Sequence, residues 1–221
     1  MSMIKICGLT RYEDIEAVNS YLPDFIGFIF YRKSKRYIEP EKAAALKKAL
    51  DKRVKAVGVF VNENIDSLTD TALNVGLDIV QLHGCEDNEY IKEVKDRTGL
   101  EVWKAFGIED GFDIERINQC AADRVLADAY TESYGGAGSI FNWDIIKNAE
   151  NVRNKIILAG GLDSTNIESA ARDVAPYALD LSSGVETEGF KDGKKIEDIV
   201  RIVRNLESEA GERYGISKTR K

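Results

Sequence analysis

Short apolar runs alternate with longer polar segments along the whole chain. Each run has the length and the β-branched or aromatic content of a buried strand, and the segment after it shows apolar residues at helical spacing. The eight runs cover residues 3–7, 25–31, 54–61, 78–82, 101–106, 124–128, 155–159 and 178–182. A strand followed by a helix, repeated through the chain, predicts parallel strands joined by crossover helices.

Three of the polar segments carry clear helix signals. Residues 40–50 begin with Pro40, which suits the first turn of a helix, and residues 64–75 begin with Asn64, a favourable N-cap. Residues 163–174 begin with two side chains whose oxygens can cap a helix. We therefore expect a helix over each of these ranges.

The number of strand–helix units in the chain indicates the fold. Eight units in 221 residues give about 27 residues per unit, near the compact end of the range for (β/α)8 barrels. We predict an α/β protein with a single (β/α)8 TIM barrel over residues 1–221, whose basic C-terminal tail frays from about residue 211. An open doubly wound sheet is the alternative. That fold normally has its glycine-rich phosphate loop after the first strand, whereas here the glycine-rich loops come late.

Composition limits the partners and the compartment. The net charge of −7 and the pI near 5.0 argue against nucleic acid or an anionic membrane as partner, because phosphate backbones need a basic face. No stretch approaches the ~18 apolar residues of a membrane span. Cys7, Cys85 and Cys120 lack disulfide or zinc spacing, and His83 is the only histidine, so we expect no metal site. These features favour a reducing cytoplasm.

Two late loops of small residues are candidates for binding phosphate. Gly160 and Gly161 follow the seventh run, and Ser183 and Gly184 follow the eighth. In (β/α)8 barrels the active site lies at the carboxyl ends of the strands, and the loops after strands seven and eight commonly bind phosphate. Glycines expose backbone N–H groups to an anion. We predict a phosphate site here, with ordinary turns as the alternative.

Cys7 and Asp128 end the first and sixth runs, and both can transfer protons. A closed barrel would place them across one pocket, where a thiol and a carboxyl form an acid/base pair. This role requires a raised pKa at Asp128 and a lowered pKa at Cys7, for which Lys5 is one possible cause. The alternatives are a cysteine that fills space and an aspartate that caps a helix or faces solvent.

Other polar and aromatic residues are open to two interpretations. The cations of residues 32–36 are typical of a solvated loop, but at this edge they also supply a guanidinium able to clamp a carboxylate. His83 ends the fourth run and either lines the pocket or satisfies backbone groups. Trp103 and the phenylalanines of residues 25–30 fit barrel core or helix packing better than a stacking platform.

Seven ordered motifs at strand ends resemble the phosphoribosylanthranilate isomerase family, which catalyses the third step of tryptophan biosynthesis. The resemblance spans nearly the whole chain and is far more specific than any one motif. The motifs are KICGLT at 5–10, SKRYI at 34–38, VGVFVN at 57–62, QLHG at 81–84, GGAG at 135–138, LAGGL at 158–162 and DLSSGVE at 180–186.

The resemblance implies a cofactor-free Amadori rearrangement of N-(5-phosphoribosyl)anthranilate to 1-(2-carboxyphenylamino)-1-deoxyribulose 5-phosphate. The partner is then this small phosphosugar–anthranilate. By the same resemblance, Asp128 protonates the ribose ring oxygen as general acid, and Cys7 removes the C2 proton as general base. Arg36 would bind the anthranilate carboxylate. The other implied substrate contacts are His83 and Asp180, with Gly160, Gly161, Ser183 and Gly184 at the phosphate.

The chain departs from the family pattern at two positions. Lys35 stands where proline is frequent, which affects the pose of Arg36, and Asn142 stands where aspartate is expected, at a helix start. There are two rival interpretations. One is another sugar-phosphate isomerase or epimerase on the same barrel, and the other is a non-catalytic phosphate-binding protein. The sequence leaves open the oligomeric state and whether a histidine-pathway substrate is also accepted.

Overall fold

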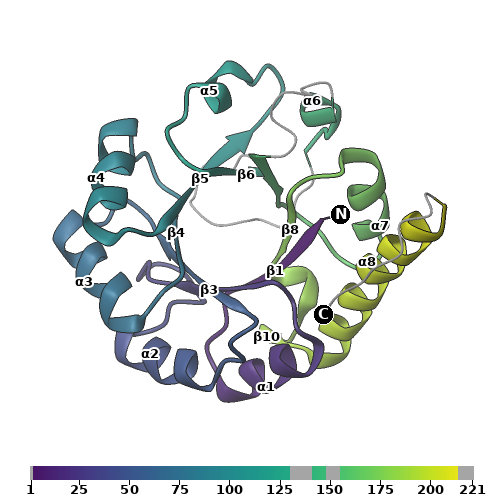
Figure 1. Ribbon diagram of the computed structural model, residues 1–221, viewed down its shortest axis with the longest axis horizontal. Coiled ribbons are helices and arrows are strands. Elements are labelled where there is room, and N and C mark those ends of the chain that lie inside the picture. The colour runs from purple at the N-terminus through teal and green to yellow at the C-terminus, as the bar shows by residue number, and fades with distance from the viewer. Residues whose placement is uncertain (1, 130–140, 148–154, 214–221) are drawn as a thin grey trace.

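Eight parallel strands form a closed barrel in chain order, and helices surround it (Figure 1). The computed structural model describes residues 2–129, 141–147 and 155–213. Consecutive strands pair in parallel, and β1 pairs with β8 to close the ring. The prediction of a (β/α)8 barrel is confirmed. The GGAG motif and the basic tail beyond residue 213 lie outside the described residues.

All eight predicted strands are present, with ends that shift by at most two residues. The strands are β1 Met3–Cys7, β2 Phe25–Ile29, β3 Lys55–Phe60, β4 Ile79–Leu82, β5 Glu101–Ile108, β6 Arg124–Ala129, β7 Ile156–Leu158 and β8 Ala178–Leu181. After β8 come a short 3-10 turn, η3 Ser183–Val185, and a hairpin of β9 Glu186–Thr187 and β10 Phe190–Lys191. This hairpin brings further polar side chains to the barrel rim.

The helices between the strands vary widely in length. They are α1 Tyr12–Tyr21, α2 Pro40–Ala49, α3 Ile65–Val75, α4 Asn88–Thr98, α5 Glu115–Asn118, α6 Asp144–Lys147, α7 Ile167–Ser169 and α8 Gly193–Arg213. The helices expected over residues 40–50 and 64–75 are confirmed, and the Asn64 side chain caps α3 by accepting from the N–H groups of Asp66 and Ser67. None of the described helices is both long and apolar enough to cross a bilayer.

The helix expected from residue 163 begins later than predicted. The Asp163 carboxylate accepts from the N–H and hydroxyl of Thr165, so it closes a turn and caps no helix. Asn166 accepts from the N–H of Asp163 in the same turn. Helix α7 then starts at Ile167 and runs into a π-helical turn, η2 Ala170–Val174. Local side-chain hydrogen bonds thus replace the first helical turn.

The apolar core has two layers, one inside the barrel and one between the strands and the helices. Trp103 is fully buried inside the barrel, where its ring meets Phe25 edge to face with centroids 5.1 Å apart. Phe28 and Phe30 belong to the outer layer. The prediction that these aromatic residues form core is confirmed. Their packing fixes the strands whose carboxyl ends carry the polar residues.

Candidate active site

A cavity at the carboxyl ends of the strands brings together nearly all the residues predicted for the site. Its lining comes from seven of the eight strands or the loops that follow them, so segments far apart in sequence face one space. The predicted residues that line it are Cys7, Arg36, His83, Asp128, Gly160, Gly161, Asp180 and Ser183. The position of this cavity matches that of active sites in barrels of this type.

Gly184 is the one predicted residue that does not line the cavity. A Cβ atom added there would collide with the carbonyl oxygen of Leu162, in the loop after β7. Glycine at this position therefore allows the loops after β7 and β8 to pack backbone against backbone. Gly160 and Gly161, with φ of 86° and 60°, adopt left-handed conformations that favour glycine. The two loops together line one wall of the cavity.

Asp180, which lines the cavity, forms an ion pair with the buried Lys5. The register of β1 against β8 sets them side by side, and Lys5 Nζ lies 3.0 and 3.1 Å from the two carboxylate oxygens. The Lys5 side chain is fully buried. Burial by itself would lower the pKa of Lys5, but the charges of Asp180 and Cys7 outweigh it and raise the pKa. Lys5 therefore stays a cation next to the thiol.

Cys7 lies at the end of β1, where Gly27 on β2 leaves room for its sulfur. A Cβ at position 27 would stand 2.6 Å from Sγ. Burial raises the pKa of the Cys7 thiol, although the charges of Lys5 and Lys191 act in the opposite direction. The role of general base requires a lowered pKa, which burial opposes. The expected influence of Lys5 is present, but desolvation is larger.

Asp128 lies one residue before the end of β6, on the cavity wall, with 8% of its surface exposed. Burial, and next the negative charge of Asp180, raise its pKa to about 6. A carboxyl with this pKa carries a proton in part of the molecules near neutral pH, as a general acid requires.

His83 faces Asp128 as a neutral imidazole. Its Nε2 lies 3.7 Å from Oδ2 of Asp128, while burial and the charges of Lys104 and Lys5 lower its pKa to about 4. The Gln81 amide nitrogen lies 3.1 Å from Nδ1 of His83. If that nitrogen donates, the ring proton resides on Nε2 and points toward Asp128. His83 thus lines the cavity, with Nε2 facing Asp128 and Nδ1 facing Gln81.

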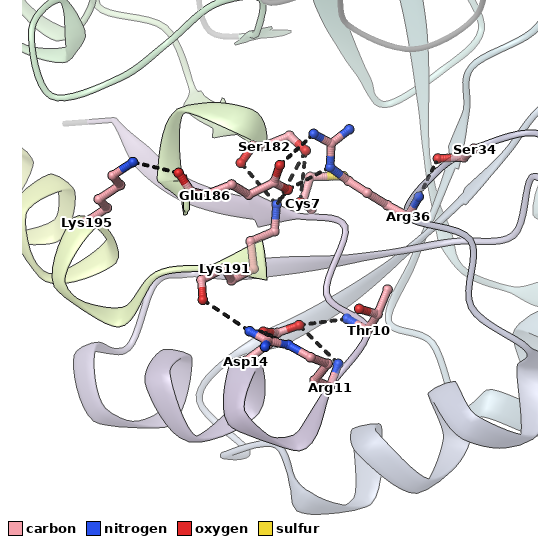
Figure 2. A network of polar contacts seen from close by, with 10 residues as sticks. All are labelled: Cys7, Thr10, Arg11, Asp14, Ser34, Arg36, Ser182, Glu186, Lys191 and Lys195. Carbon is pink, nitrogen blue, oxygen red and sulfur yellow. Dashed lines mark hydrogen bonds and ion pairs between the residues drawn. The ribbon is translucent and has the colours of Figure 1, made fainter. Parts of the chain in front are cut away.

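Arg36 reaches the cavity from the loop after β2 and is already paired with a carboxylate. Its Nε and Nη2 donate to the two oxygens of Glu186 at 2.7 and 2.8 Å (Figure 2). Lys191 Nζ donates to the same Glu186 at 2.6 Å and to the Ser182 carbonyl at 3.0 Å. Nothing in the local sequence pattern links Glu186 or Lys191 to residue 36, so their part in this network could not be predicted from sequence.

Fold and cavity together define a (β/α)8-barrel protein with a carboxyl, a thiol and a wall of glycine-rich loops at the carboxyl edge of the barrel. The family model described as N-(5'-phosphoribosyl)anthranilate (PRA) isomerase matches residues 4–202. The chain belongs to this family.

Relatives and solved structures agree with the family assignment over nearly the full chain. The N-(5'-phosphoribosyl)anthranilate isomerase of Acetivibrio thermocellus is 44% identical over 214 residues, covering 94% of this chain and 98% of that protein. The protein of the same name from Thermoanaerobacter sp. is 47% identical, covering 93% and 100%. The crystal structure of phosphoribosyl anthranilate isomerase from Thermotoga maritima matches with a TM-score of 0.85 at 39% identity, again covering 93% and 100%.

One further structure shows an enzyme of this name with a ligand. It holds reduced 1-(o-carboxyphenylamino)-1-deoxyribulose 5-phosphate, and it matches with a TM-score of 0.82 at 36% identity, covering 93% of this chain and all of that one. That ligand carries a phosphate, a sugar chain and an aromatic carboxylate.

Proposed function

We propose that this chain isomerises N-(5-phosphoribosyl)anthranilate to 1-(2-carboxyphenylamino)-1-deoxyribulose 5-phosphate by general acid/base catalysis. Family membership supports the reaction. The observation that carries the assignment of roles is that Cys7 and Asp128 line one cavity, and that the pKa of Asp128 is raised to about 6. A base and an acid on separate strands can act on two different atoms of one substrate.

In the proposed reaction, protonated Asp128 gives its proton to the ribose ring oxygen. The C1–O bond breaks, and the nitrogen lone pair forms a C1=N bond, which makes a Schiff base. Cys7, as the thiolate, takes the proton from C2, and the C2–H electrons form a C1=C2 bond while the nitrogen is neutralised. Lys5 stabilises the thiolate because its cation lies next to Cys7 and opposes the rise in the thiol pKa that burial causes. The enolamine then tautomerises to the ketone.

The remaining roles concern binding. The loops with Gly160, Gly161 and Ser183 would hold the phosphate through backbone N–H groups, with Gly184 allowing the two loops to meet. Arg36 would bind the anthranilate carboxylate. Asp180, held by Lys5, would orient the sugar, and His83 would contact the substrate beside Asp128.

The test follows anthranilate fluorescence while the purified protein meets freshly generated phosphoribosylanthranilate. We expect decay well above the spontaneous background for the wild-type chain. Cys7→Ser and Asp128→Asn should each lose activity by a factor of about 10²–10⁴, the usual contribution of a general acid or base, while still binding the reduced product analogue. Wild-type turnover in both variants would contradict the assignment of acid and base.

We also place the reaction in the cytoplasm. Cys7, Cys85 and Cys120 are all free thiols, which supports a reducing compartment. Purification under air with and without reductant, followed by thiol counting, tests this assignment. A stable disulfide in protein taken directly from the cell would contradict it.

A further inference from the structure

The carboxylate of Glu186 occupies only one edge of the Arg36 guanidinium. The contacts use Nε and Nη2, at 2.7 and 2.8 Å. A guanidinium offers a second bidentate edge, formed by Nη1 and Nη2. Among the described residues, none forms a hydrogen bond with Nη1 of Arg36. The second edge is therefore available to another planar acceptor, and Arg36 lines the cavity.

Glu186 is held in place before any ligand arrives. Its backbone carbonyl accepts from Lys195 Nζ at 2.6 Å, and its side chain accepts from Lys191 at 2.6 Å (Figure 2). Glu186 and Lys191 lie on the hairpin of β9 and β10, and Arg11 holds this hairpin in place. The Arg11 guanidinium donates to the Lys191 carbonyl at 3.3 Å and lies 4.2 Å from the centre of the Phe190 ring. The carboxylate thus has a rigid support.

The stem of Arg36 is confined on its other side by Gly8. This glycine has a φ of 85°, and a Cβ atom there would collide with Cδ of Arg36. The side chain therefore lies directly over the backbone that follows Cys7. Contact with Gly8 and pairing with Glu186 together restrict the guanidinium, whose side chain is 26% exposed, to one orientation.

Charge determines whether a second carboxylate can bind here. Arg36 and Glu186 alone would be neutral, and a substrate carboxylate would gain little by approaching them. Lys191 adds a positive charge, and its side chain is only 1% exposed, so solvent screens it weakly. Two cations with one internal carboxylate leave one net positive charge for the incoming anion.

We propose that Glu186 and Lys191 are positioning residues for recognition of the substrate carboxylate. Glu186 fixes Arg36 so that its second edge faces the cavity. Lys191 balances the charge of Glu186 so that Arg36 still attracts an anion. This inference rests on the proposed function, because it assumes a ligand with an aromatic carboxylate.

The variant Glu186→Gln distinguishes a positioning role of Glu186 from the effect of its negative charge on ligand binding. The amide removes a negative charge near the cavity, so charge alone would make a carboxylate ligand bind more tightly. Positioning requires the opposite result, because the amide presents only one acceptor oxygen to Arg36 and cannot hold both Nε and Nη2. Lys191→Met tests the role proposed for Lys191, since it removes the positive charge that balances the negative charge of Glu186.

The experiment measures binding of two probes by calorimetry, reduced 1-(o-carboxyphenylamino)-1-deoxyribulose 5-phosphate and its phenylamino counterpart without the carboxylate. We expect Glu186→Gln and Lys191→Met each to weaken binding of the carboxylated probe about tenfold, the loss typical of one charge-assisted contact, and the other probe less than about twofold. The matched control is Glu168→Gln, which changes an exposed glutamate paired with Arg172 and should alter neither affinity.

Three results would overturn the inference. The first is unchanged or tighter binding of the carboxylated probe to Glu186→Gln, and the second is an equal loss for both probes in that variant. The third is a wild-type protein that binds both probes equally well. If Glu186→Gln does not fold, Glu186→Asp, which keeps the negative charge on a shorter side chain, takes its place, and an unchanged affinity for the carboxylated probe would then overturn the inference. The proposed function is tested separately by wild-type turnover, which these binding measurements do not use.

Discussion

Replacing the buried acid Asp128 with asparagine should stabilise the fold at neutral and alkaline pH while it removes activity. In the folded chain the pKa of Asp128 is raised from 3.8 to about 6, first by burial and then by the charge of Asp180. The folded state therefore holds this proton more tightly than the unfolded state. Folding stability from this group is full at low pH and is lost as the pH rises from about 4 to about 6.

The pKa difference gives the size of the effect. A shift of the pKa from 3.8 to about 6 corresponds to ~3 kcal/mol of folding free energy lost by the wild type at pH 8, from 1.36 kcal/mol per unit. Asparagine has no charge to bury, and its side-chain oxygen can still accept from the N–H of Ala129, as Asp128 does at 2.9 Å. The Asp128→Asn variant should thus avoid most of this loss.

Urea unfolding at several pH values measures this difference. Between pH 4 and pH 8 the stability of Asp128→Asn relative to wild type should rise by up to ~3 kcal/mol, with about half of the change complete at pH 5. Asp70→Asn, on the exposed surface of α3, controls for removing one carboxylate from an acidic chain. A relative stability that is constant over this pH range would refute the reasoning, as would an equal pH dependence in the control.

Three further predictions concern the residues that build the site. Gly184→Ala should cost about 1–3 kcal/mol in urea unfolding, because the new methyl group meets fixed backbone of the loop after β7; an unchanged midpoint would contradict this. Lys5→Met should cost about 3–5 kcal/mol, since it leaves Asp180 buried without its cation, and stability equal to wild type would show that the pair is not needed. Because Cys7 is buried and burial raises the pKa of its thiol, iodoacetamide at pH 7 should modify the exposed Cys85 first, as followed by peptide mass spectrometry; equal rates would contradict this.

The sequence was sufficient to predict the strands and the edge on which the site lies. Apolar runs such as residues 3–7 and 124–128 carry a local signal, and a parallel barrel places all their carboxyl ends together. Cys7 and Asp128 were therefore found to share a cavity, as predicted. The helix start near residue 163 was missed because side-chain hydrogen bonds in a turn compete with the helix there.

Contacts between distant segments could not be predicted from sequence. Glu186 pairs with Arg36 across 150 residues, and neither position carries a pattern that indicates the other. The rise in the pKa of Cys7 could not be predicted for a similar reason. The neighbouring cation was visible in the sequence, but the depth of burial depends on how closely β2 packs at Gly27.

The junction between β1 and β8 has a consequence for how the protein acquires activity. Lys5 and Asp180 are 175 positions apart, and Cys7 lies on the same strand as Lys5. During synthesis on a ribosome, Cys7 and Lys5 emerge early. They can contact Asp180 only after β8 has been translated. With the roles proposed for Cys7, Lys5 and Asp180, catalytic competence is gained at ring closure, late in assembly. Turnover would then report completed folding more directly than helix content does.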